Sequence, residues 1–124
     1  MKTEVGKTSN PASRLPVFGE HTPPKDMERM IENAEQASNF LKAISHPGRL
    51  MILCHLASGE KSVTELEQLL SARQATVSQQ LTKLRYERLV KPRRVGKAIF
   101  YSLADERSKK VMEVIYDLFC GSSD

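Results

Sequence analysis

The sequence predicts a mainly α-helical domain with a single β-hairpin, and two observations lead to this class. Five segments repeat apolar residues at the three- and four-residue spacing of amphipathic helices. Residues 89–103 lose that period and form two short extended segments around Gly96-Lys97, which predicts a hairpin. A length of 124 residues suits one domain with a modest core.

The first segment is predicted to be a flexible arm. Residues 1–24 hold four prolines among scattered polar residues, whereas the folded domain is predicted to cover residues 25–124. The first helix is predicted from Asp26 to Ile44. Asp26 and Glu28 lie in its first turn, where the helix dipole favours acidic side chains.

The second predicted helix is largely buried, and two short helices follow it. The second helix begins at Pro47, a residue tolerated in a first turn, and ends before Gly59. The third opens with the capping box Ser62-Val63-Thr64-Glu65. We expect its apolar residues to face inward: Val63, Leu66, Leu69 and Leu70. The turn at residues 71–73 then leads to a fourth helix at residues 74–87.

The fifth helix is predicted from Asp105 to Phe119. Its apolar face contains Ser108, Val111, Met112, Ile115, Leu118 and Phe119. Two short helices joined by a three-residue turn and followed by a hairpin define a winged helix-turn-helix. The predicted fold is therefore mainly α with a β-hairpin wing.

Positive charge is concentrated on the fourth helix and the hairpin. Residues 73–101 contain eight basic side chains and one acid, a net charge of +7, which leaves −3 for the rest of a chain whose total is +4. A basic region beside an acidic remainder is typical of proteins that bind a polyanion, above all nucleic acid. The simpler alternative is a solvated charged face.

The fourth helix is the candidate recognition helix. With Val77, Leu81 and Leu84 facing inward, the opposite face is rich in amides and hydroxyls and poor in acids. Such groups can read base edges, whereas cations more often contact phosphate. A solvated polar helix is the alternative. The predicted base-reading residues are Gln74, Thr76, Ser78 and Gln79, and the predicted phosphate contacts on this helix are Lys83 and Arg85.

The hairpin tip carries three more cations around its glycine. Arg93, Arg94 and Lys97 suit phosphate or the minor groove, although a solvated turn would carry such residues too. We expect the partner to be double-stranded DNA.

Three motifs between Phe40 and Leu103 resemble the ArsR/SmtB family of winged helix-turn-helix repressors. They are LKAISHPGRLMIL, ARQATVSQQLTKLRYERLV and RRVGKAIFYSL. The resemblance implies a homodimer formed through the first and last helices, which binds an inverted-repeat operator and is released by an inducer. One departure is Arg73, where the family often has a serine cap.

The metal sites of many such relatives are missing here. Ser62-Val63-Thr64 replaces a Cys-x-Cys segment, and the fifth helix has acids but no histidine. We therefore expect no metal and no cofactor. Cys54 and Cys120 resemble the cysteine pair of the persulfide-sensing branch of the family, which implies redox sensing of reactive sulfur species.

Other roles for the two cysteines stay open at this point. They could be metal ligands in a metal-responsive repressor, with His55 or a carboxylate such as Asp117, or Cys54 could be an inert core residue. We find no phosphate loop, nucleophile elbow or paired helical histidines, so we expect no enzyme. With no apolar run of membrane-spanning length, the predicted location is the cytoplasm.

Overall fold

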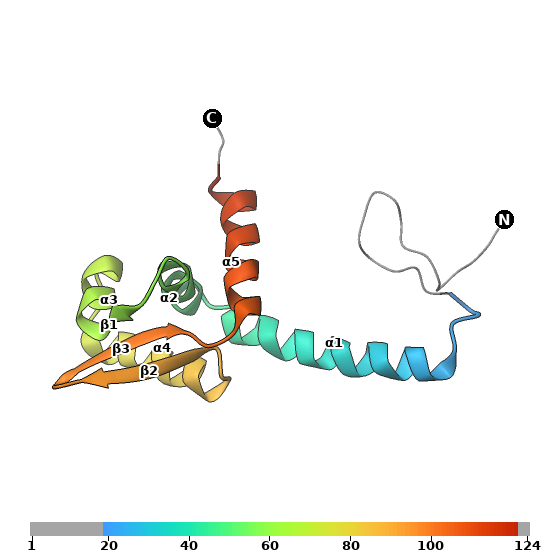
Figure 1. Ribbon diagram of the computed structural model, residues 1–124. Helices are drawn as coiled ribbons and strands as arrows, with labels where there is room; N and C mark the ends of the chain where they lie inside the picture. Colours follow the sequence, from blue (N-terminus) through green and yellow to red (C-terminus); the bar gives the residue numbers. More distant parts are fainter. Residues whose placement is uncertain (1–18, 122–124) are drawn as a thin grey trace. The chain divides into compact units, whose positions relative to one another are not determined.

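The computed structural model describes residues 19–121 (Figure 1). Its elements are α1 (Pro24–Ile44), α2 (Pro47–Ala57), β1 (Lys61–Ser62), α3 (Val63–Leu70), α4 (Gln74–Tyr86), β2 (Val90–Val95), β3 (Ala98–Leu103) and α5 (Glu106–Phe119). This order confirms the predicted winged helix-turn-helix and adds β1 to it. The predicted arm, residues 1–24, falls largely outside the described residues.

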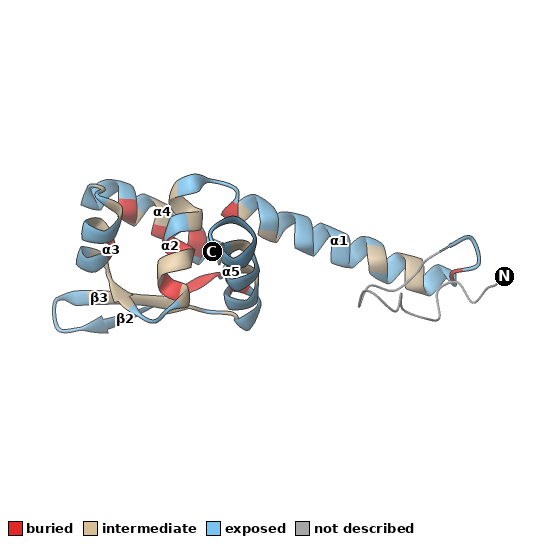
Figure 2. Cartoon of the chain, turned by 90° about the horizontal axis from the view of Figure 1, so that it is seen from above, coloured by how far each residue is buried: buried red, intermediate tan, exposed pale blue. Residues whose placement is uncertain are grey.

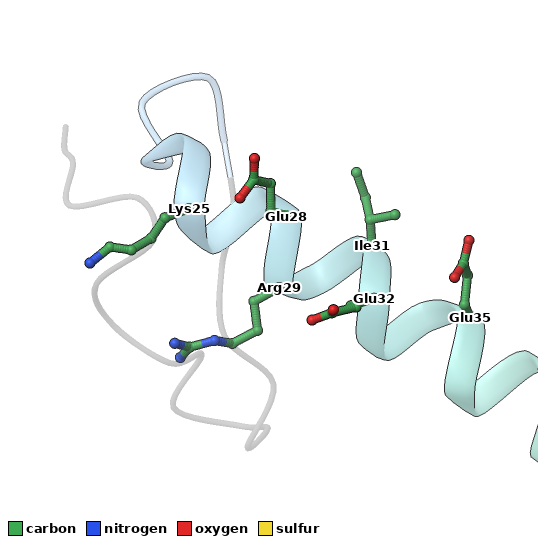
Figure 3. Close-up of a pocket in the computed structure, with 6 residues that line it drawn as sticks. All are labelled: Lys25, Glu28, Arg29, Ile31, Glu32 and Glu35. Atoms are coloured by element: carbon green, nitrogen blue, oxygen red, sulfur yellow. The ribbon is translucent and has the colours of Figure 1, made fainter.

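The chain divides into two units, Met1–Asn39 and Phe40–Asp124. The second unit contains the helix-turn-helix, the wing and α5, and the first contains most of α1. The first unit has a pocket of about 520 Å³ whose lining comes from one helix, α1. Figure 3 shows the six side chains that line it. Ile31 lies there among exposed charged side chains and is itself 58% exposed.

The helix-turn-helix is held by local caps that the sequence encodes. Ser62 accepts a hydrogen bond from the backbone N–H of Glu65, whose side chain accepts one from the N–H of Ser62, so the predicted capping box is confirmed. Helix α3 ends at Leu70, and its C-cap Ser71 adopts the left-handed conformation with φ of 50°. That residue turns the chain toward α4.

The wing is part of a three-stranded antiparallel sheet in the order β1-β3-β2. Val95 pairs with Ala98 across the turn, where Gly96 has φ of 58°, a value that favours glycine. Strand β1 pairs Ser62 with Phe100 and so attaches the start of α3 to the middle of β3. The sequence did not reveal this two-residue strand because it is too short to show a period.

The core of the second unit surrounds α2, which packs against α5, α4 and β3 (Figure 2). Ile52 and Leu53 on α2 belong to the same hydrophobic core as Leu66 of α3 and Leu84 of α4, and all four are at most 1% exposed. One inward assignment was wrong: Leu69 is 47% exposed. Leu69 lies in the last turn of this eight-residue helix, and nearly half of its surface is open to solvent.

Helix α5 buries only its first half. Ser108 and Met112 are buried, whereas Leu118 and Phe119 are 72% and 81% exposed. The apolar face predicted for this helix therefore extends beyond the part that the core covers. Within residues 19–121, no helix combines the length and hydropathy that crossing a membrane requires.

Candidate nucleic-acid interface and thiol pair

The inward side of α4 fixes which of its residues face solvent. Val77, Leu81 and Leu84 are at most 1% exposed, as the sequence predicted. The face opposite them is exposed, and its residues are Ala75, Thr76, Gln79, Thr82 and Lys83. An α-helix turns 100° per residue, so one buried stripe determines the orientation of every other side chain on the helix.

The four predicted base-reading residues lie on this surface in two groups. Gln74 and the half-buried Ser78 line a hollow of about 300 Å³ that also includes Lys97 and Phe100 of the wing. Thr76 lines a smaller hollow on the α2 side, and Gln79 is exposed. The structure thus places amide and hydroxyl groups along the solvent side of α4, with two of them next to the wing.

Arg73 is the N-cap of α4, and its side chain makes no capping hydrogen bond. A serine at this position, as the family often has, could cap the helix with its hydroxyl, so the departure at Arg73 leaves α4 without a side-chain cap. Arg73 is exposed and immediately precedes the first turn of α4, whose backbone N–H groups have no acceptor within the helix. Cations and N–H groups together favour an anion at this position.

The predicted phosphate-contacting cations are at the end of α4 and on the wing. Lys83 and Arg85 lie in the last turn of α4 and are exposed. Arg94 and Lys97 are exposed on β2 and in the hairpin turn. None of these four side chains forms an ion pair with another described residue.

Arg93 differs from the other wing cations because it has a protein partner. It donates two hydrogen bonds to Glu60, in the turn before β1, and its guanidinium lies 5.4 Å from the centroid of the Phe100 ring. The hydrogen bonds from Arg93 lower the pKa of Glu60, and Glu60 in turn raises the pKa of Arg93. The pair joins β2 to the turn between α2 and β1.

The two cysteines are both free and come from α2 and the end of α5. Cys54 is half-buried, with its Sγ 3.8 Å from the Sδ of Met112, and Cys120 is the exposed C-cap of α5. Burial, and secondly the charge of Cys120, raise the pKa of Cys54. The two thiols therefore belong to α2 and to the C-cap of α5, two helices that pack against each other, and they differ in access to solvent.

A groove of about 540 Å³ lies beside Cys54, between α2 and α5. Its lining is Cys54, Ala57, Ser58, Met112, Glu113, Tyr116 and Asp117. Although Asp117 shares this groove with Cys54, no group of three or more histidine, cysteine or acidic side chains among residues 19–121 is arranged to hold a metal ion. His55 is half-buried and does not line the groove.

Two long-range contacts of this region were not foreseen from the sequence. They are the Glu60–Arg93 pair and a link from Arg49 to Gln80. Glu60 lies just before the capping box, and its negative charge, opposite in sign to the basic wing, was the signal in the sequence that could have indicated this pair. Arg49 offered none, because its partners are a backbone carbonyl and a neutral amide.

Comparison with known proteins gives one consistent result. Residues 46–91 match the model of the bacterial regulatory protein, arsR family. A biofilm growth-associated repressor from Agrobacterium fabrum is 44% identical over 95 residues, which cover 77% of this chain and 81% of that protein.

Solved structures agree with the sequence match. Reduced HlyU from Vibrio cholerae aligns with a TM-score of 0.73 at 36% identity, over 76% of this chain and 99% of that one. The transcriptional repressor BigR from Xylella fastidiosa aligns with a TM-score of 0.72 at 43% identity, over 77% of this chain and 98% of that one. With its winged helix-turn-helix and the exposed polar face of α4, the chain belongs to the arsR family of DNA-binding transcription regulators.

Proposed function

We propose that the protein is a homodimeric transcriptional repressor that binds an inverted-repeat operator and leaves it when reactive sulfur species link Cys54 to Cys120. The observation that carries DNA reading is the exposed amide and hydroxyl face of α4 beside a cationic wing. Amides and hydroxyls recognise base edges, and flanking cations bind phosphate. The A. fabrum and X. fastidiosa relatives are named as repressors, which supports the direction of control.

A second copy of this chain is the proposed dimer partner. On α5, Val114, Leu118 and Phe119 are more than half exposed, and Ile31 and Leu41 of α1 are similarly exposed. Apolar side chains gathered on helices favour burial against a partner surface. Two identical subunits related by a twofold axis would present two recognition helices to the two halves of a palindromic operator.

The thiol switch rests on the different settings of the two cysteines. Cys120 is exposed and is the proposed attacking thiol, whereas Cys54 is half-buried with a raised pKa and is the proposed resolving thiol. The V. cholerae relative was solved in a form described as reduced, which supports a role for oxidation state in this branch. An inert Cys54 packed on Met112 is the simpler alternative.

The proposed chemistry is sulfur transfer followed by displacement. The Cys120 thiolate attacks the outer sulfur of a persulfide RS–SH, forming Cys120–S–SH and releasing RS⁻. The Cys54 thiolate then attacks Sγ of Cys120 and expels HS⁻, so the persulfide is reduced and the two thiols become a disulfide. If Cys54 is first converted to a persulfide as well, its outer sulfur attacks Sγ of Cys120, expels HS⁻ and leaves a trisulfide. The longer bridge can join cysteines whose Cα atoms lie farther apart than the limit of about 7 Å for a direct disulfide.

Such a bridge would act on DNA binding through α2. A covalent link to α5 constrains α2, and α2 packs against α4. Half-sites of an operator lie about one helical turn apart, so a small displacement of the recognition helices in a dimer lowers affinity.

The test measures operator binding before and after treatment with a persulfide donor. We expect wild-type protein to lose affinity and Cys54→Ser and Cys120→Ser to bind normally without responding. The intact mass of the treated protein should show either added sulfur from a polysulfide bridge or the loss of two hydrogens from a disulfide. Hydrogen peroxide serves as the control oxidant, because it carries no sulfur. A single mutant that still responds fully contradicts the dithiol switch, and release by stoichiometric zinc would instead favour a metal-responsive repressor.

A further inference from the structure

Arg49, in the first turn of α2, links the end of α1 to the recognition helix. Its Nε donates a hydrogen bond of 2.6 Å to the carbonyl of Ala43, in the last turn of α1. Its Nη1 donates one of 3.1 Å to Oε1 of Gln80, in the middle of α4. Both contacts are partly buried, so one side chain connects three helices within the second unit.

The contact with Ala43 anchors the guanidinium. The last carbonyls of a helix have no partner within it and carry partial negative charge, which a cation stabilises. The guanidinium is planar and its N–H groups form a rigid fork, so fixing Nε on Ala43 also fixes where Nη1 points. Gln80 is therefore held at a defined position relative to the end of α1.

The packing around Gln80 agrees with a fixed position. A Cβ added to Gly48 would lie 3.8 Å from Cγ of Gln80, an ordinary van der Waals distance, so the start of α2 lies next to the Gln80 side chain. Gln80 lies one turn after Thr76, and the two line the same hollow of about 210 Å³. The link from Arg49 thus acts immediately beside the predicted base-reading surface.

We propose that Arg49 is a positioning residue for sequence recognition: it holds Gln80 against the end of α1 and so sets the orientation of α4 in the major groove. In this arrangement Oε1 of Gln80 is occupied by Arg49, and Gln80 supports the recognition surface without reading a base. The proposal rests on the DNA-reading role of α4 proposed above. It concerns orientation, so it predicts a loss of specific binding that is separate from phosphate affinity.

The test compares two duplexes of equal length, an operator selected from random DNA and a scrambled sequence. Arg49→Lys keeps the positive charge but lacks the fork that joins both partners. We expect operator affinity to fall on the order of tenfold, as for one lost hydrogen bond of about 1.4 kcal/mol, with unchanged affinity for the scrambled duplex. If Arg49 instead contacted a phosphate, Arg49→Lys should keep most of the operator affinity, because the lysine ammonium could make the same phosphate contact.

Gln80→Ala is the second variant and does not alter charge. We expect the same selective loss, an unchanged set of selected bases, and no further loss in the double variant Arg49→Lys/Gln80→Ala, because both changes break one link. Arg107→Lys is the matched control and should leave both affinities unchanged, since among residues 19–121 the hydrogen bonds of Arg107 go only to Asp105, the cap of its own helix.

Three outcomes overturn the proposal. They are an unchanged operator affinity in Arg49→Lys, an equal loss on both duplexes, and additive losses with an altered base preference in Gln80→Ala. Failure of the proposed function is a different result, since the wild-type protein would then select no sequence at all.

Discussion

Arg93 and Glu60 form a two-pronged ion pair, with Nε 2.9 Å from Oε2 and Nη2 2.7 Å from Oε1. The pair fastens the outer strand of the wing to the turn that precedes β1. A DNA phosphate would have to compete with Glu60 for this guanidinium, whereas Arg94 beside it is exposed and faces no such competition within the described residues. Neighbouring wing arginines therefore should contribute differently to DNA affinity.

The first prediction compares the two arginines by salt dependence. Each phosphate contact adds about 0.9 to the slope of log affinity against log salt concentration. Arg94→Gln should lower the slope by about that amount on operator and scrambled DNA alike. Arg93→Gln should lower it less. If both variants lower the slope by the same amount, DNA displaces Glu60 from Arg93.

The second prediction concerns stability and pH. Because Arg93 lowers the pKa of Glu60 in the folded protein, the pair stabilises the fold above the ordinary glutamate value of 4.5, and this stabilisation is lost as pH falls through the folded value. Glu60→Gln should unfold at a lower temperature than wild type at pH 7, with the difference shrinking below pH 4.5. A difference that persists at pH 3 would point to packing instead.

The third prediction concerns thiol reactivity. The thiolate is the reactive form, and burial raises the pKa of Cys54 while Cys120 is exposed. Iodoacetamide at pH 8 should therefore modify Cys120 severalfold faster than Cys54, as measured by peptide mass spectrometry. In denaturant the two rates should converge. Faster labelling of Cys54 in the folded protein would reverse the proposed order of attack.

The fourth prediction concerns the turn between α3 and α4. Ser71 has φ of 50°, a conformation that costs a non-glycine residue about 1–2 kcal/mol. Ser71→Gly should stabilise the protein by about 0.5–1 kcal/mol in urea unfolding, after the entropy cost of glycine is counted. Ser58→Gly is the comparison variant and should destabilise, because that helix cap has φ of −89° and its hydroxyl donates a hydrogen bond to the carbonyl of His55.

The fifth prediction concerns Ser108, buried at the start of α5. Its Oγ has no hydrogen-bond partner among the described residues. A buried hydroxyl without a partner costs about 1–3 kcal/mol, so Ser108→Ala should leave stability unchanged or raise it by about 1 kcal/mol in urea unfolding. Ser45→Ala, which removes a hydroxyl that donates to the carbonyl of Lys42, should not stabilise. A clear loss in Ser108→Ala would indicate that its hydroxyl has a partner.

The elements of this fold could be predicted because the forces that define them are local. The apolar period of α4 placed Val77 and Leu81 inside, and the Ser62–Glu65 capping box set where α3 begins. The same reasoning failed at Leu69, whose apolar character does not say whether a neighbour covers it. Strand β1 was missed because two residues carry no period, and its pairing depends on Phe100 far along the chain.

By itself, the sequence determined the winged helix-turn-helix, the exposed polar face of α4 and the concentration of cations near the wing. Only the tertiary structure decided which of those groups already have partners. Arg49 meets Gln80 across 31 positions and Arg93 meets Glu60 across 33, and nothing in the residues between them specifies either contact. The physical reason is that such contacts arise when packed elements bring distant side chains together, whereas helical period and capping act within a few residues.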